Sequence, residues 1–221
     1  MDSIGQLALD SLWPLLRGAL IGTIPLTLLS FTLGMVLALI IALMRMSSNA
    51  VLSGIARAFI SAVRGTPLLV QLFVIFYGLP SLGATIDPWP SAIIAFSINV
   101  AGYAAEIIRA AILSVPRGQW EAGYTIGMSH TRTLFRLILP QALRVATPPL
   151  SNTFISLVKD TSLASLILVT EMFRKAQEIA ASTLQFMVLY MEAAVIYWVI
   201  CLLLSMYQNR LEGRLEKYVA H

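Results

Sequence analysis

The sequence predicts an all-α integral membrane protein with five transmembrane helices. Of the 221 residues, 58% are hydrophobic and 12% are charged, whereas soluble domains carry about 25% charged residues. The apolar residues form long runs, and charged or turn-forming segments separate these runs. We therefore expect one compact membrane domain, with no room for a soluble catalytic domain.

The net charge of +4 does not indicate a nucleic-acid partner, because the basic residues are spread among the loops. The single cysteine, Cys201, lies in an apolar run and is expected to be a small core residue. Asp2 and Asp10 stand where a cleavable signal peptide would have a basic segment, so none is expected.

The first half of the chain predicts two spans. Residues 1–18 form a mildly amphipathic N-terminal segment at the membrane interface, with Trp13 as an anchor. The first span covers roughly residues 20–44, and a short loop with a moderately polar helix follows over 46–64. The second span covers roughly 67–79, or starts near Leu52 as one long tilted helix. Pro67 fits a first helical turn.

The second half predicts three more spans. A turn-rich loop over 81–90 precedes the third span, at roughly 91–113, and a polar loop covers 116–140. The fourth span begins near Ala142 and is interrupted around Lys159, Asp160 and Thr161. Residues 163–183 are expected to be a helix too polar to span. The fifth span covers roughly 184–206, so the membrane domain is 19–208 and the cytoplasmic tail 209–221.

The basic residues predict the orientation, because cytoplasmic loops are enriched in lysine and arginine. With the polar loop in the cytoplasm, the outer side keeps only Arg17, Lys159, Arg174 and Lys175. The N-terminus is then outside and the C-terminus inside. The inner side holds Arg45, Arg57, Arg64, Arg109, Arg117, Arg132, Arg136, Arg144, Arg210, Arg214 and Lys217.

The polar loop between two apolar regions, GQWEAGYTIGMSHTRTLFRLILP, is predicted to form two short helices. Trp120, Tyr124, Gly127 and Met128 fall on one face at helical spacing. The helices break at Gly127, Ser129 or Thr131 caps the second helix, and that helix ends at Pro140.

This loop resembles the signature of the membrane subunits of ATP-binding-cassette (ABC) importers, E-A-A, three residues, G, nine residues, I-x-L-P. Glu121, Ala122, Gly127, Leu139 and Pro140 match it, whereas Gly123 and Leu137 replace an alanine and the isoleucine. The alternative is an ordinary amphipathic loop on the lipid headgroups.

In that family the first helix of the loop docks in a groove on the ATPase subunit. The resemblance therefore implies a type I ABC importer permease fold with a cytoplasmic coupling-helix loop. Its implied partners are a second permease subunit, two cytoplasmic ABC ATPase subunits that carry ATP and Mg²⁺, and an extracytoplasmic amino-acid-binding protein. No cofactor is expected on this chain. The implied coupling residues are Arg117, Gln119, Trp120, Glu121, Ala122, Gly127, Met128 and Arg132.

Other segments look like the polar amino-acid branch of these importers, among them RGTPLLVQLFVIFYGLP, NVAGYAAEIIRAAI and SLVKDTSLA. Through PPLSNTFISLVKDTSLAS the chain is most similar to bacterial L-cystine permeases. The resemblance implies L-cystine as substrate, with glutamine, histidine and arginine as alternatives. Thr153 is neutral where importers of basic amino acids can carry an extra carboxylate, which weakens the arginine alternative.

Ionisable groups at membrane depth are functional candidates. Lys159 and Asp160 offer one cation and one anion to a zwitterionic amino acid, at a break that exposes backbone groups. An internal Lys159–Asp160 pair that stabilises the break or a dimer contact is an equal alternative. The other candidates for substrate binding are polar side chains nearby or on other spans: Asn152, Thr153, Ser156, Asn99, Tyr103, Thr66 and Gln71.

Several polar residues also have structural interpretations. Glu106 and Arg109 are three apart and are expected to pair. For Gln71 an interhelical hydrogen bond is favoured slightly over a substrate contact. Glu192 is expected to pair with Arg174 or Lys175.

The sequence contains no Gly-rich phosphate loop, no metal-ligand spacing around its two histidines and no paired catalytic carboxylates in a cleft. The chain is therefore expected to lack a catalytic site, a metal site and an ATPase of its own. Two other functions stay open. One is a channel or facilitator without an ATPase, and the other is a membrane enzyme that uses Asp160 and Glu106.

Overall fold

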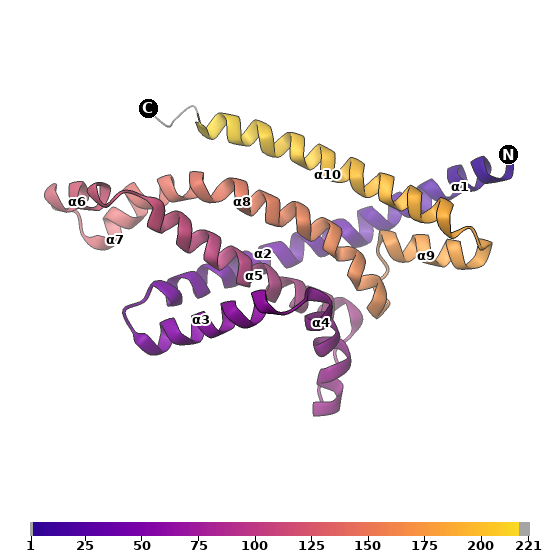
Figure 1. Cartoon of the computed structure of the whole chain (residues 1–221), viewed down its shortest axis with the longest axis horizontal. Coiled ribbons are helices and arrows are strands. Elements are labelled where there is room, and N and C mark those ends of the chain that lie inside the picture. The colour runs from indigo at the N-terminus through magenta and orange to yellow at the C-terminus, as the bar shows by residue number, and fades with distance from the viewer. Residues whose placement is uncertain (1, 217–221) are drawn as a thin grey trace. The chain divides into compact units, whose positions relative to one another are not determined.

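The computed structural model describes residues 2–216, and these form helices without any strand (Figure 1). The end of the expected tail, with Lys217 and His221, lies outside the described residues. The described chain divides into two compact units, each assembled from three stretches. Unit 1 contains residues 2–33, 66–97 and 154–207, and unit 2 contains 34–65, 98–153 and 208–216.

The first helix is longer than the sequence predicts. Helix α1 (Asp2–Gly18), the π-helical turn η1 (Ala19–Thr23) and α2 (Ile24–Met46) follow one another without a break. The expected interfacial segment 1–18 therefore continues directly into the first span. Pro14 lies inside α1, and it is tolerated there.

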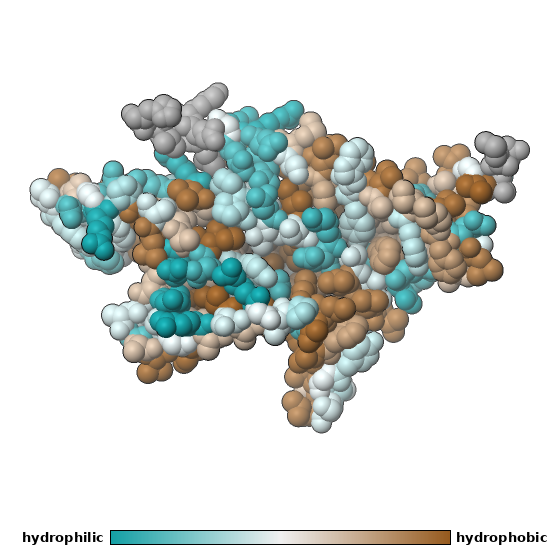
Figure 2. All heavy atoms as spheres, viewed as in Figure 1, coloured by the Kyte–Doolittle hydropathy of each residue, from teal (hydrophilic) through white to brown (hydrophobic). Residues whose placement is uncertain are grey.

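The second span differs most from expectation. Helix α3 (Ala50–Gly65) ends before Pro67, whose backbone is extended (φ −63°, ψ 138°), so the single long helix starting near Leu52 is wrong. Pro67 is the N-cap of α4 (Leu68–Phe73) rather than part of its first turn. A π turn η2 (Val74–Gly78) and a 3-10 turn η3 (Leu79–Leu82) complete this segment. Its surface is brown and apolar in Figure 2 and pale only towards the tip.

Helix α5 (Pro88–Ser114) agrees with the third span. The polar loop contains α6 (Arg117–Thr125) and α7 (His130–Thr133), and the latter continues through the π turn η4 (Leu134–Ile138) into α8 (Leu139–Asp160). The prediction that this helix ends at Pro140 is wrong. Proline lacks an N–H and crowds the preceding turn, and the π turn directly before Pro140 widens the helix there.

Helix α8 ends at Asp160, as the expected interruption requires, and a 3-10 helix η5 (Thr161–Ile167) follows. The expected helix over 163–183 is broken, because Leu168 adopts a left-handed conformation (φ 65°) and α9 (Met172–Thr183) starts after it. The last helix, α10 (Phe186–Glu216), contains the fifth span and extends it.

Within residues 2–216, three helices are long and apolar enough to cross a membrane by themselves: Ile4–Met46, Pro88–Ser114 and Phe186–Arg214. Two broken pairs, Ala50–Gly65 with Leu68–Leu82 and His130–Ile167 with Met172–Thr183, bring the number to five if each pair is one span. The five predicted spans therefore correspond to three long helices and two interrupted segments.

Each unit has its own apolar core. In unit 1, small residues let α1, α9 and α10 approach closely, as is typical of membrane helices. This core consists of Leu15, Ala19, Met172, Ala176, Ala180, Leu189, Ala193 and Ile196. In unit 2, the end of α5 packs on the beginning of α8 through Ala111, Ile112, Val115, Ile138, Ala142 and Ala146.

Candidate functional site

The polar loop is a helix–turn–helix whose turn depends on one glycine. The N–H of Gly127 donates to the carbonyl of Tyr124 (2.9 Å) and that of Met128 to the carbonyl of Gly123 (3.0 Å), so α6 ends in a Schellman motif. This motif requires a left-handed residue, and Gly127 has φ 79°. The predicted break between the two helices at Gly127 is confirmed. Ser129, one of the two predicted caps, accepts a hydrogen bond from the N–H of Arg132 (3.4 Å).

His130 joins the two short helices of the loop. Its ring stacks on Trp120, with centroids 4.9 Å apart and an interplanar angle of 18°. The Tyr124 hydroxyl lies 2.8 Å from Nδ1 of His130. From the sequence, the histidines were weighed only as metal ligands, although the spacing of six between Tyr124 and His130 across a turn was a usable signal for this contact.

The loop is also fixed to the membrane helices of its unit. Trp120 packs against the core between α5 and α8, together with Leu134 and Leu137. Gly123 is buried, and a Cβ there would lie 2.6 Å from Cγ2 and 2.7 Å from Oγ1 of Thr133. Helix α6 therefore packs directly on the helical segment that continues into α8.

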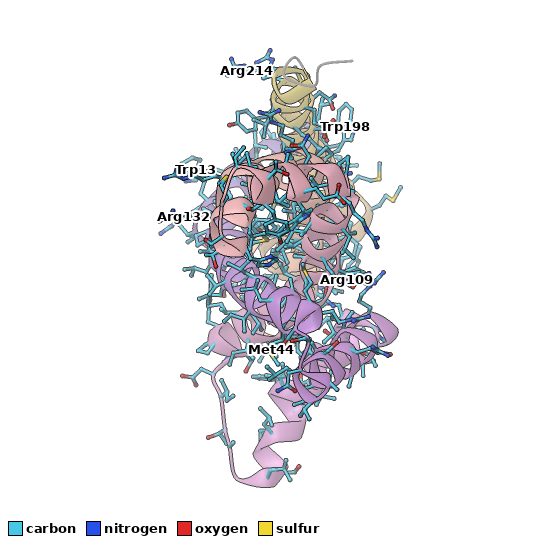
Figure 3. All side chains as sticks on the ribbon, turned by 90° about the vertical axis from the view of Figure 1, so that its left-hand side faces the viewer. Trp13, Met44, Arg109, Arg132, Trp198 and Arg214 are labelled. Atoms are coloured by element: carbon cyan, nitrogen blue, oxygen red, sulfur yellow. The ribbon has the colours of Figure 1, made fainter. Side chains whose placement is uncertain are left out.

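The predicted coupling residues differ in exposure. Trp120 and Met128 are half-buried, whereas Tyr124 and Gly127 are exposed, so the four residues predicted on one face differ in burial. Arg132 projects away from its helix in Figure 3. The exposed members of the set are Arg117, Gln119, Glu121, Ala122, Gly127 and Arg132. Two large apolar side chains that were not predicted for this surface are also exposed on the loop, Ile126 (74% exposed) and Phe135 (61% exposed).

The candidate substrate residues of the fourth span lie on α8. Asn152, Ser156 and Lys159 are exposed and follow one another at intervals of four and three, which places them on one face. Asp160 and Thr153 are half-buried. Asn152 and Thr153 belong to unit 2, and the other three belong to unit 1.

Several of these groups already have protein partners. Oδ1 of Asn152 accepts from Gln208 of α10 (3.1 Å), and the hydroxyl of Thr153 donates to the carbonyl of Pro149 (2.9 Å). Lys159 and Asp160 form no ion pair within the described residues, because adjacent helical side chains diverge by about 100°. A role of these two charges in stabilising the break or a dimer contact stays an alternative to substrate binding.

The remaining candidates are Thr66, just before α4, Gln71 on α4, and Asn99 and Tyr103 on α5. Nε2 of Gln71 donates to the hydroxyl (2.9 Å) and the carbonyl (3.1 Å) of Thr66, so these bonds are local to the start of α4. Tyr103 is exposed and lies under the guanidinium of Arg64, 5.4 Å from the ring centroid. Asn99 is half-buried.

The expected pair of Glu106 and Arg109 on α5 is confirmed as an ion pair. The pairing expected for Glu192 is wrong, since its Oε2 accepts a hydrogen bond from Ser11 of α1 (2.5 Å). Arg174 and Lys175 pair instead with Glu178, at 3.3 Å and 2.7 Å.

A buried carboxylate that the sequence analysis did not single out organises unit 1. Glu171 caps α9 by accepting from the N–H groups of Phe173 (2.9 Å) and Arg174 (2.7 Å). Its Oε2 also accepts from the hydroxyls of Tyr197 on α10 (2.9 Å) and Thr23 in η1 (3.3 Å). One side chain thus joins the first helix, α9 and α10. The signal in the sequence was an N-cap acid directly before the amphipathic helix.

The sequence matches the model of the family of binding-protein-dependent transport system inner membrane components over residues 14–217. The chain belongs to this family. Members of this family are permease subunits of ABC importers, multi-pass proteins of the inner membrane and not enzymes, which implies an ATPase and a binding protein as partners. The all-α fold, with three to five candidate spans among the described residues, agrees with this membership.

Curated relatives of the permease cover nearly all of it. The L-cystine transport system permease protein TcyB of Bacillus subtilis (strain 168) is 65% identical over 216 residues, which are 97% of this chain and 92% of the relative. The glutamine transport system permease protein GlnP of Escherichia coli (strain K12) is 37% identical over 213 residues, which are 94% of this chain and 97% of the relative.

Two solved structures share the fold of the permease. The crystal structure of an amino acid ABC transporter with histidines superposes with a TM-score of 0.86 at 38% identity, covering 90% of this chain and 93% of that chain. The MetNI methionine ABC transporter in an inward-facing conformation gives 0.76 at 20% identity, covering 91% and 96%. The second likeness supports the fold alone.

Proposed function

We propose that this chain is the permease subunit of an ATP-driven importer of L-cystine. The assignment of L-cystine as the substrate rests on the 65% identity to an L-cystine permease across 97% of the chain. Polar amino acids such as glutamine and histidine are the second candidates, supported by the glutamine permease at 37% identity and the amino acid transporter at 38%.

The assembly we propose contains two copies of this chain, two ATPase subunits that bind ATP and Mg²⁺, and an extracytoplasmic binding protein. Residues 19–208 form the membrane domain and 116–140 the coupling loop. The N-terminus lies outside and the C-terminus inside, as the distribution of basic residues supports.

The coupling loop meets the ATPase through exposed side chains of its two short helices, Arg117, Gln119 and Glu121 on α6 and Arg132 on α7. These side chains are exposed in the single chain, as a docking surface requires. The half-buried Trp120 then has a second role, because it anchors the loop to the core between α5 and α8. ATP-driven movement of the loop therefore moves the start of α8, and the substrate path changes its access from outside to inside.

Substrate contacts are assigned to the exposed face of α8, with Asn152, Ser156 and Lys159, and to Asp160 beside it. L-cystine carries two amino and two carboxylate groups. Lys159 can bind one of the carboxylates and Asp160 one of the amino groups, because these two side chains form no ion pair with each other in the described residues. Thr153, Asn99, Tyr103, Thr66 and Gln71 complete the proposed set as neutral hydrogen-bonding groups.

An uptake assay tests the substrate. Membrane vesicles that contain the whole assembly should take up labelled L-cystine in an ATP-dependent way. An excess of unlabelled L-cystine should compete fully, and glutamine, histidine and arginine should compete weakly. Stronger competition by one of these three would transfer the assignment to that amino acid. Uptake that continues without the ATPase subunits would favour a facilitator.

A further inference from the structure

A groove of about 540 Å³ lies between α1 and α9 within unit 1. Along α1 and the following turn η1 it is lined by Trp13, Arg17 and Ile21, which follow one another at intervals of four residues. Lys175 and Glu178 of α9 line the other wall. None of these five side chains belongs to the coupling loop or to the proposed substrate set.

The order of side chains along α1 matches the order of groups in a phospholipid. From Gly18 to Met44 the sequence has no charged residue, so Arg17 stands at the boundary of the hydrocarbon region. Trp13 lies one turn farther out, is 65% exposed, and points away from its helix in Figure 3. Aromatic side chains of this kind prefer the headgroup level.

Below the groove the surface is apolar. Ile21 is 57% exposed and Leu28 is 51% exposed, and Ile24 lies between them on the same strip. At about 1.5 Å per residue, this strip extends roughly 10 Å from the groove into the membrane. It offers a continuous contact for one acyl chain.

The charge of the groove selects the headgroup. Arg17 is exposed and has no ion-pair partner within the described residues, whereas Lys175 forms an ion pair with Glu178 (2.7 Å). The groove-lining charges are two positive and one negative, which leaves a net charge of +1. A single phosphodiester without an amine balances this charge.

We propose that the α1–α9 groove is a binding site for an anionic glycerophospholipid, whose phosphate is held by Arg17 and Lys175. Trp13 packs against the glycerol region and Ile21 against the first part of the acyl chain. The leaflet follows from the proposed orientation and is the outer one. The site itself does not depend on which amino acid is transported.

Lipid binding to the full-length chain tests this site. The chain is purified in detergent and titrated with phosphatidylglycerol or phosphatidylethanolamine, and bound lipid is counted by native mass spectrometry. The Arg17→Gln variant should bind phosphatidylglycerol about fivefold more weakly. Arg17→Lys should bind as the unchanged chain does. Arg57→Gln, which removes an exposed arginine from α3, is the matched control and should have no effect.

A second measurement uses Trp13. Brominated phosphatidylglycerol should quench the fluorescence of Trp13. The total quenching of tryptophan fluorescence should therefore decrease in Trp13→Phe. Equal binding by Arg17→Gln and the unchanged chain would overturn the proposal. So would binding of phosphatidylethanolamine as strong as that of phosphatidylglycerol, or quenching that Trp13→Phe leaves unchanged.

Discussion

Glu171 is a carboxylate that the fold keeps out of contact with water. Burial of an ionised group is costly unless hydrogen bonds compensate it, and here two backbone N–H groups and two hydroxyls donate to it. From the sequence, Glu171 only made its segment look too polar to span. The structure instead shows it at the junction of the first helix, α9 and α10.

The close approach of η1 to this carboxylate gives the first prediction. A Cβ on Gly22 would lie 2.6 Å from Cα of Glu171 and 2.6 Å from the carbonyl oxygen of Thr170. Because both are backbone atoms that cannot rotate away, Gly22→Ala should destabilise the chain by about 1–3 kcal/mol. The midpoint of thermal unfolding in detergent measures this change.

Gly54→Ala is the matched control, because a Cβ at that position in α3 meets nothing within 4 Å. Alanine favours a helix over glycine by about 0.5–1 kcal/mol, so this variant should unfold at the same temperature or a higher one. A Gly22→Ala chain as stable as the Gly54→Ala chain would show that η1 does not pack tightly on Glu171.

At this scale the sequence allows prediction of local pairs better than of distant ones. The Glu106–Arg109 pair follows from a spacing of three on one helix, and it is confirmed. Glu192 was assigned to cations about seventeen residues away, but its partner Ser11 comes from the other end of the chain. One sequence alone does not show that residues 11 and 192 lie close together in space, so this contact could not be predicted.

The elements of this chain are helices with irregular turns at defined places. Three π turns, η1, η2 and η4, lie inside longer helical segments, and such turns are frequent at functional sites. Hydrophobic periodicity identified the helices themselves. It did not show where one helix continues into the next. The second helix of the loop was expected to end at Pro140, but Pro140 lies inside α8, directly after the π turn η4.

The turn of the coupling loop gives a prediction on transport. Gly127 has φ 79°, a conformation that asparagine tolerates and a β-branched residue does not. Gly127→Val should therefore distort the loop, so that ATP hydrolysis continues while uptake falls about tenfold or more. Gly127→Asn should retain coupled transport. The ratio of transported substrate to hydrolysed ATP in vesicles is the measurement.

If Gly127→Val transported substrate with the normal ratio, the loop could not be the mechanical link. If Gly127→Asn failed as completely as Gly127→Val, the absence of a side chain would matter more than the left-handed conformation.

The contact between α6 and α7 gives a third prediction. The family signature has alanine where this chain has Gly123, and Thr133 fills the space of that methyl group. Gly123→Ala alone should lower stability by about 1–2 kcal/mol. Thr133→Ala in the same chain should restore most of this loss, with a coupling free energy of about 0.5–3 kcal/mol. Thermal unfolding of the two single variants and the double variant measures the coupling, and additive losses would contradict it.

For the whole molecule, composition alone was sufficient to predict a polytopic membrane protein. The family followed from five matched positions in the coupling loop, and it is confirmed over residues 14–217. The bounds of the interrupted spans could not be predicted, because residues near Pro67 and Leu168 break helices through backbone conformation rather than polarity. The candidate substrate set also stays a prediction, since its members divide between the two units.

The proposed orientation can be tested by labelling. Cys201 is the single cysteine, so Cys201→Ala gives a background without thiols. Ser81→Cys in that background should react with a membrane-impermeant maleimide in intact cells. Ser48→Cys should react only after the membrane is permeabilised. Both serines are exposed, so a difference reflects the side of the membrane. The reverse pattern would invert the topology.

The π turn η4 has a genetic consequence. A π turn contains one residue more than the α-helical turn it replaces, so loss of one codon within Leu134–Ile138 would let the backbone close into a regular helix. The shorter turn would still complete about one revolution, so α6 and α7 would keep nearly their present direction around the axis of α8. In-frame deletion of one residue at this place should therefore preserve transport better than deletion of one residue within a regular turn of α8, which would rotate everything before it by about 100°.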